Sequence, residues 1–272
     1  HVVLTDSMRN VIKKNSYGIF SKAADGQTNT ITIENELIKV HLSSLGGRIF
    51  SVELKKYKTN IGLPLILFDK DSSKQSLLFV ANAQFFSTDS LFFQPFGTSF
   101  NVSEKDSGSI AFRLLANDQN KYIEYVYSLQ GNSYEVGCSI NMVGMQDVIA
   151  ANTSYLTLDW QMLTPSQEKN ISNQQKTSDI YFKYTEEEVD NITETTEGPK
   201  SLDSKIKWLA FKQQFFTSAL IADNSFEKPI SISSINTHGS GSYVKDFSAS
   251  LTIPYDHQEK EKFNMAFYSF KV

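Results

Sequence analysis

Four histidines are the side chains of this sequence whose ordinary pKa best suits proton transfer near neutral pH. A histidine that acts as a general acid needs a carboxylate base close to it in a cleft. His1 begins the chain, and His41 alternates with Lys39 on the polar side of a predicted strand. His238 lies in a Gly/Ser-rich turn, and His257 follows a proline in a polar segment. No recognisable catalytic sequence flanks any of them, so we predict no catalytic residue.

The single cysteine, Cys138, excludes an intrachain disulfide. It shares one face of a predicted strand with Val136 and Ile140, which indicates a buried apolar side chain rather than a nucleophile. The sequence contains no H-E-x-x-H or D-x-D-x-D-G spacing, no G-x-S-x-G elbow and no glycine-rich phosphate loop. We therefore predict no metal site and no cofactor.

An acidic stretch within residues 165–198 is a further candidate for binding chemistry. Its carboxylates are Glu186, Glu187, Glu188, Glu194 and Glu197. Consecutive acids point to alternate sides of an extended chain and do not converge on one cation. We interpret the stretch as a solvated insertion that contains one strand at 179–184.

The composition limits the partners of the chain. Its 272 residues, 40% of them hydrophobic, suffice for one large β domain or two small ones. A net charge of -4 argues against nucleic-acid binding, which needs a basic stripe, and against a polybasic membrane-surface protein. The sequence has no apolar run of the roughly 18–20 residues that cross a membrane and no signal peptide. We expect any targeting or membrane segment to lie outside this chain.

Alternating hydrophobicity is the strongest structural signal. In 31–43, apolar residues recur at alternate positions, which predicts a strand with one buried face. Gly46 and Gly47 then allow a tight turn with positive φ, and the alternation resumes over 48–54. Any β-hairpin of an antiparallel sandwich would satisfy this pattern. Further strands are predicted at 76–80, 109–116, 120–130, 134–143, 154–161, 205–222, 230–235, 242–253 and 263–270.

Two further segments need separate interpretation. Residues 82–99 are rich in phenylalanine and could form a ledge that binds apolar segments, but their spacing favours core aromatics. Residues 1–29 differ from the rest of the chain, and loose helical spacing of Met8, Val11 and Ile12 predicts a short helix in a partly ordered lead-in.

Two motifs resemble the large periplasmic domain of YidC-type membrane protein insertases. The first runs Glu34-Asn35-Glu36-Leu37-Ile38-Lys39-Val40, then Ser43-Ser44-Leu45-Gly46-Gly47-Arg48-Ile49 and Val52-Glu53-Leu54. The second matches the family at Trp208, Ala210, Gln214, Phe215, Phe216 and Ala219. The turn and strand at 129–136, of the form L-x-G-N-S-Y-x-V, also occur in sugar-mutarotase sandwiches. Both motifs are interpreted as core elements.

The resemblance covers about residues 17–268 and implies an all-β fold with few helices, a large antiparallel supersandwich of the galactose-mutarotase type. It implies a lead-in at 1–29 after an absent first transmembrane helix, and a sandwich domain at 30–272. That domain would lie on the periplasmic side of the bacterial inner membrane as a non-catalytic scaffold or docking surface. Its implied partners are nascent membrane proteins and auxiliary subunits of the Sec translocon, with membrane contact through segments absent from this chain. Core motifs do not locate a partner-binding surface. The alternative is a mutarotase-like sugar-active enzyme or carbohydrate-binding domain.

Overall fold

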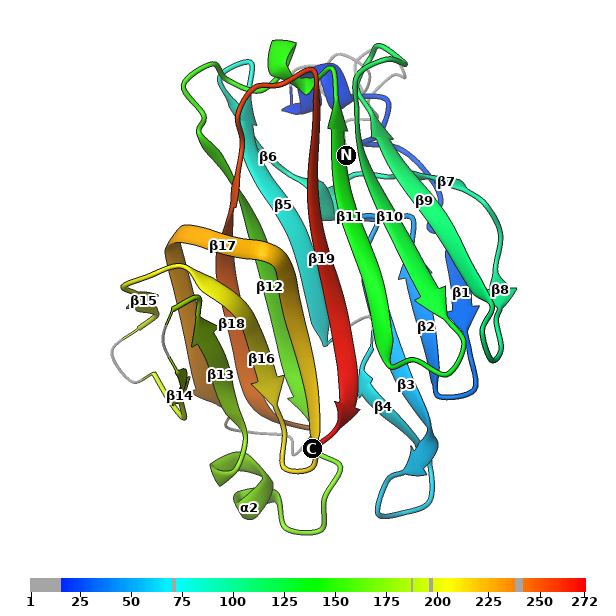
Figure 1. Ribbon diagram of the computed structural model, residues 1–272, viewed down its shortest axis with the longest axis vertical. Helices are drawn as coiled ribbons and strands as arrows, with labels where there is room; N and C mark the ends of the chain where they lie inside the picture. The colour runs from blue at the N-terminus through cyan, green and yellow to red at the C-terminus, as the bar shows by residue number, and fades with distance from the viewer. Residues whose placement is uncertain (1–15, 70–71, 187, 196–197, 238–241) are drawn as a thin grey trace, which may run out of the picture.

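The protein folds as two β-sheets packed face to face (Figure 1). The computed structural model describes residues 16–69, 72–186, 188–195, 198–237 and 242–272. Nearly all strand pairs within these ranges are antiparallel. The predicted all-β sandwich with few helices is confirmed.

The smaller sheet has five strands among the described residues. In spatial order they are β4 (Pro64–Phe68), β3 (Ile49–Lys58), β2 (Ile38–Ser43), β1 (Thr30–Glu34) and β8 (Phe100–Asn101).

The larger sheet curls around the core. Its main path is β6 (Gln84–Ser87), β5 (Ser73–Ala81), β12 (Tyr155–Pro165), β18 (Tyr243–Pro254), β17 (Phe216–Asn236), β19 (Lys260–Lys271), β11 (Glu135–Val143), β10 (Tyr122–Gln130), β9 (Ser107–Leu115) and β7 (Gln94–Phe96). Four further strands branch from β17, namely β16 (Ile206–Lys212), β13 (Asp179–Tyr184), β14 (Val189–Ile192) and β15 (Lys200–Leu202). The first part of β17 pairs with β16 and β19, and its last part pairs with β18.

The core lies between facing sheet surfaces. Trp160 of β12 stacks on Phe211 of β16 with ring centroids 4.0 Å apart and meets Phe267 of β19 edge-on at 6.1 Å. Phe112 and Tyr127 meet edge-on at 6.2 Å in the half of the sandwich formed by β9 and β10. The two pairs that Trp160 makes join strands far apart in sequence, and all three pairs add to the stabilisation that apolar burial supplies.

The structure corrects the prediction of one strand over residues 31–43. The segment forms a hairpin of β1 and β2, because the Asn35 side chain closes a turn between them. Its Oδ1 accepts bonds from the backbone N–H groups of Leu37 and Ile38 at 2.8 and 2.9 Å. Its Nδ2 donates to the carbonyl oxygens of Gln130 and Ser133, both at 2.7 Å. Asn35 is fully buried, and its amide is satisfied by carbonyl groups distant in sequence. A local hydrophobicity pattern contains no information about such partners.

The Gly46–Gly47 turn is confirmed as a structural element. Both glycines have positive φ, at +79° and +63°. A Cβ on Gly47 would lie 2.7 Å from Phe93 Cδ1 and 3.0 Å from Tyr125 Cδ2. The Gly47 carbonyl also accepts a 2.8 Å bond from the buried Tyr127 hydroxyl. This turn therefore fixes the small sheet against β10.

Gly47→Ala is expected to lower the free energy of unfolding by about 2–5 kcal/mol, because left-handed strain and overpacking add at this site. Gly62→Ala is the matched control, since Gly62 has φ +84° but open space around its missing Cβ. The control should lose only about 1 kcal/mol from backbone strain. Urea unfolding followed by circular dichroism measures both values. Equal losses would show that the contact with Phe93 and Tyr125 adds nothing.

The phenylalanines of 82–99 divide between the core and the surface. Phe86 and Phe93 are buried, which confirms the core interpretation for them. The interpretation is wrong for Phe85 and Phe96, which are exposed, because strand alternation in β6 and β7 directs them outward. Phe92 is half-buried.

The lead-in is described from residue 16 onward. The 3-10 helix η1 (Gly18–Phe20) places Phe20 fully inside the core, 5.2 Å from the ring of Phe86. The helix predicted around Met8 lies outside the described residues. The boundary between a lead-in at 1–29 and a sandwich at 30–272 stays a prediction.

A short helix within the polar insertion was not predicted. Helix α2 (Ile171–Lys176) is capped at its N-terminus by Asn170, whose side chain accepts a 2.9 Å bond from the Asn173 N–H. Glu186 and Glu188 are exposed, as expected for a solvated stretch, while Glu187 and Glu197 lie outside the described residues.

Candidate docking groove

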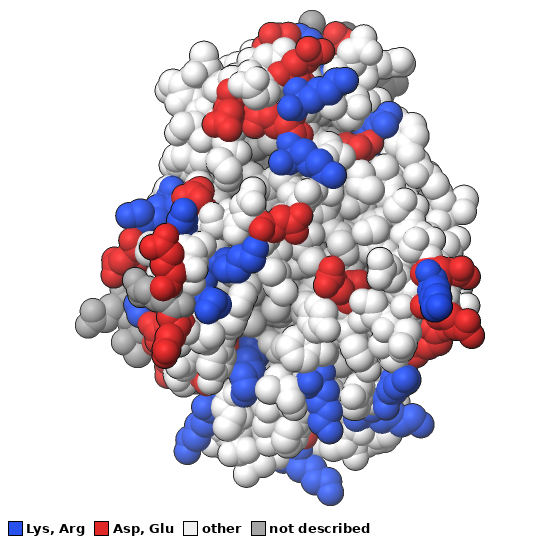
Figure 2. Space-filling model, in the orientation of Figure 1, with Lys and Arg blue, Asp and Glu red and all other residues white. Residues whose placement is uncertain are grey.

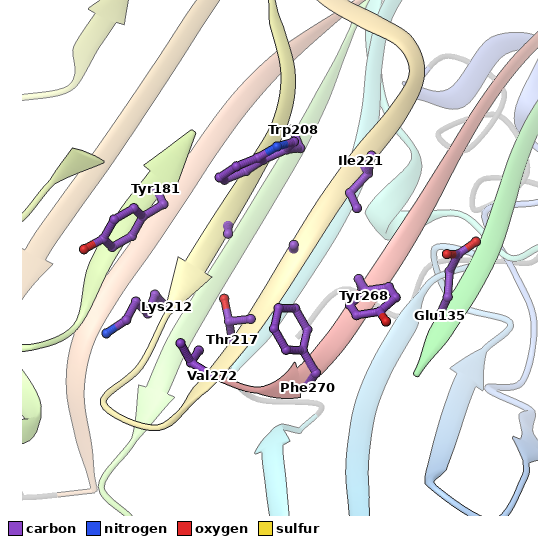
Figure 3. Close-up of a pocket in the computed structure, with 11 residues that line it drawn as sticks. Glu135, Tyr181, Trp208, Lys212, Thr217, Ile221, Tyr268, Phe270 and Val272 are labelled. Carbon is purple, nitrogen blue, oxygen red and sulfur yellow. The ribbon is translucent and has the colours of Figure 1, made fainter. Parts of the chain in front are cut away.

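An apolar groove of about 530 Å³ lies on the outer face of the larger sheet, away from the core. Strands β13, β16, β17, β19 and β11 form it, and the labelled side chains in Figure 3 stand up from these strands. The lining residues are Glu135, Tyr181, Trp208, Ala210, Lys212, Thr217, Ala219, Ile221, Tyr268, Phe270 and Val272.

Two alanines form the floor of the groove. Ala210 of β16 and Ala219 of β17 are direct neighbours, with Tyr181 on one side of the pair and Tyr268 on the other. Directly paired residues on one sheet face lie about 5 Å apart, so the missing side-chain volume at two adjacent positions hollows the sheet. The large rings on both sides become the walls.

Trp208 lines this groove and is half-buried, which corrects its interpretation as a core residue. Sequence alternation places Ile206, Trp208 and Ala210 on one face. The strand register shifts between Ile206 and Trp208, so Ile206 points into the core while Trp208 and Ala210 point outward. A β-bulge of this kind reverses the faces and leaves no clear mark in a hydrophobicity pattern.

The charges of the groove lie among its rim residues. Lys212 Nζ donates to the carbonyl oxygens of Thr177 and Gln213 at 3.2 and 3.4 Å. Glu135 is exposed and lies beside Tyr268 in the strand register. The floor and the remaining walls offer aromatic and aliphatic surface, which suits an apolar segment rather than a polar reactant.

The described histidines do not line this groove. His41 of β2 shares a 2.9 Å hydrogen bond between its Nδ1 and the Thr32 hydroxyl, and burial lowers its pKa. His257 follows β18, and its Nε2 lies 2.6 Å from the Thr153 carbonyl oxygen. His1 and His238 lie outside the described residues.

Cys138 is buried, as predicted. Burial raises the pKa of its thiol, which makes the reactive thiolate harder to form. Within the described ranges, His, Cys, Asp and Glu form no group of three or more that could hold a metal ion.

A second hollow, of about 510 Å³, is polar and lies on the outer face of β5, β12 and β18. Asp159 lies in it, accepts a 2.6 Å bond from the Ser250 hydroxyl, and has a pKa that burial raises. Lys74 and Asp89 also line this hollow, and the exposed ring of Phe85 lies at its side.

Solved structures with the same architecture define the fold class. A galactose mutarotase-like protein from Lactobacillus casei is similar with a TM-score of 0.53 at 9% identity, over 89% of this chain and 100% of that one. An aldose epimerase homologue from C. elegans has a TM-score of 0.51 at 7% identity, over 90% and 100%. Such identities show the fold alone. The chain is a β-supersandwich of the galactose mutarotase-like type.

Sequence similarity then gives the family. Residues 30–269 match the family described as the YidC periplasmic domain. The membrane protein insertase YidC of Bacteroides fragilis is 32% identical over 253 residues, which are 93% of this chain and 40% of that protein. The corresponding insertase of Parabacteroides distasonis is 29% identical over 266 residues, 97% and 41%. This chain belongs to the YidC periplasmic domain family, as its two motifs predicted.

The chain spans about 40% of the length of these relatives. Across its described residues, we find no helix with the length and apolar character needed to cross a membrane.

Proposed function

We propose that this chain is a non-catalytic docking domain of a membrane protein insertase, on the periplasmic side of the bacterial inner membrane. The observation that carries the proposal is the apolar groove floored by Ala210 and Ala219. The clients of an insertase are membrane proteins, and their apolar segments match the aromatic and aliphatic walls of the groove. In this proposal, the groove receives such a segment while the domain serves as a scaffold beside auxiliary subunits of the Sec translocon.

The proposal is tested by site-specific photocrosslinking in the full-length protein in its membrane. With a photoreactive phenylalanine analogue at Phe270, in the groove wall, we expect crosslinks to nascent membrane proteins. The same analogue at Tyr155 is the matched control, because Tyr155 is a partly exposed aromatic residue at the start of β12, outside the groove.

Ala219→Trp should fill the groove floor and reduce the Phe270 crosslinks at least severalfold. Crosslinks of equal yield at Phe270 and Tyr155, or crosslinks that persist in Ala219→Trp, would contradict the groove as the docking site. Crosslinks to translocon subunits in place of clients would assign the groove to the scaffold role.

A sugar-active or sugar-binding domain is the second candidate, and the polar hollow around Asp159 is the observation that favours it. Hydroxyl and carboxylate groups there could exchange hydrogen bonds with a sugar, and the Phe85 ring could pack against its apolar face. NMR measurement of anomer exchange in common aldohexoses tests the sugar-active form of this candidate, and line broadening of the sugar signals tests the sugar-binding form. An exchange rate equal to that of buffer alone, together with unbroadened sugar signals, would contradict this candidate.

A further inference from the structure

Four exposed apolar side chains gather at one end of the sandwich. Ile61 and Leu63, in the turn between β3 and β4, are 75% and 57% exposed. Ile171 of α2 and Phe215 of the β16–β17 turn are 45% and 43% exposed. The two turns and helix α2 lie at the lower end of Figure 1, where the chain reaches Val272.

Direct contacts hold these two turns and helix α2 together as one surface. Tyr57 of β3 meets Phe216 of β17 edge-on at 5.4 Å. Gln213 Nε2 donates to the Leu67 carbonyl at 3.4 Å, which joins the β16–β17 turn to β4. Lys212 Nζ donates to the Thr177 carbonyl at 3.2 Å, just after α2. These contacts hold the elements that carry the four apolar side chains in fixed positions relative to one another.

The same end is basic, although the whole chain carries a net charge of -4. The described segments 56–69, 167–177, 211–216 and 271–272 contain six lysines against two acids, Asp69 and Glu168, a local charge of +4. Figure 2 shows blue side chains gathered along this lower end and red ones concentrated elsewhere. Its lysines are Lys56, Lys58, Lys169, Lys176, Lys212 and Lys271.

We infer that this lysine-flanked apolar end docks onto the surface of an anionic lipid bilayer. The apolar side chains protrude from two turns and a helix, so a broad lipid surface can take up all of them at once. Protruding aliphatic and aromatic groups enter the interface between headgroups and acyl chains, and lysines around them attract anionic headgroups. Because Val272 and Lys212 also line the groove, docking places one end of the groove beside the bilayer.

Flotation of the 272-residue chain with vesicles tests this inference. We expect binding to vesicles of phosphatidylcholine mixed with phosphatidylglycerol, and much weaker binding to phosphatidylcholine alone. A lysine near an anionic surface contributes on the order of fivefold to binding, so Lys56→Glu with Lys58→Glu should weaken it by at least about 25-fold. Ile61→Ser with Leu63→Ser should weaken it by about tenfold or more. Added salt should also weaken it.

Phe85→Ser is the matched control, because it removes a ring that is 68% exposed from the β5–β6 hairpin. It should leave vesicle binding unchanged, and all variants should keep the parent melting temperature. Equal binding to neutral and anionic vesicles would overturn the inference. So would no binding to anionic vesicles, or binding that survives either paired substitution.

A solvatochromic dye gives a second readout of the same contact. The dye is attached to the new thiol of Leu63→Cys, while Cys138 is buried and protected from labelling. Its emission should shift to the blue with anionic vesicles, and the same dye on Phe85→Cys should not shift. A shift of equal size at both positions would overturn the inference.

Discussion

Trp160→Ala is expected to lower the free energy of unfolding by about 3–5 kcal/mol, the usual cost of removing a buried aromatic side chain. Trp160 is 2% exposed and stacks on Phe211 across the core. The substitution removes contacts with both Phe211 and Phe267 and leaves a cavity that two separate strands would have to close. Urea unfolding monitored by far-UV circular dichroism measures the loss.

Trp208→Ala is the matched control, because these are the two tryptophans of the chain and only one is in the core. Trp208 lies in the groove wall, so we expect a loss of about 1 kcal/mol or less. A loss at Trp208 that equals the loss at Trp160 would place both rings in the core and contradict the outward face of β16. The same control variant should weaken crosslinking from the groove while leaving the fold intact.

Alkaline pH is expected to unfold this domain steeply. Tyr125, Tyr127 and Cys138 are buried side by side, and burial raises the pKa of all three groups. A raised pKa in the folded state means that the unfolded chain releases its proton first. The stabilisation is complete below the unfolded pKa values, about 9–10, and is lost as pH rises above them. Each group then removes about 1.4 kcal/mol of unfolding free energy per pH unit.

Lys245 acts in the opposite direction over part of this range. Lys245 is buried, and burial lowers its pKa. The unfolding free energy of the domain therefore rises as pH rises toward the ordinary lysine pKa of 10.5. Above that value its contribution is constant. Tyr255 is also buried and burial raises its pKa, so it acts in the same direction as the other three groups. The slope should therefore reach at least about 4 kcal/mol per pH unit.

Urea unfolding across pH 8 to about 11.5 at constant ionic strength tests this expectation. Tyr127→Phe should reduce the slope by about 1.4 kcal/mol per pH unit, and Cys138→Ala by the same amount. Tyr155→Phe, at a 42% exposed tyrosine, should leave the slope unchanged. An unfolding free energy that stays constant to pH 11.5 would contradict the buried arrangement of the three groups.

The sequence predicted strands best where alternation is unbroken and turns are local. Strands β9, β10 and β11 follow their predicted ranges closely, because one face of each packs on the core and the other is polar. The hairpin at Asn35 was missed because its side chain is satisfied by carbonyls 95 and 98 positions away. Tertiary hydrogen bonds of this kind leave no periodic pattern in the sequence.

The sequence identified residues of the groove but not the sheet face on which they lie. Trp208, Ala210 and Ala219 belong to a recognised motif, but the bulge in β16 turns the first two away from the core. The pairing of Ala210 with Ala219 depends on strand register, which composition does not report. Whole-chain charge concealed the basic end in the same way, since a sum of -4 contains no information about where the lysines lie.

Strand β17 has a consequence for how the chain folds during synthesis. It joins β18 to β19 in the larger sheet. Strands β11, β12 and β16 pair with β19, β18 and β17, and these three partners emerge from the ribosome late. Ser139 and Asn264, joined by a 2.7 Å hydrogen bond, lie 125 positions apart. Closing so long a segment is entropically costly and slow. The domain therefore completes its sheet only after residues 260–271 have been made, and earlier intermediates expose strand edges that holding chaperones can bind.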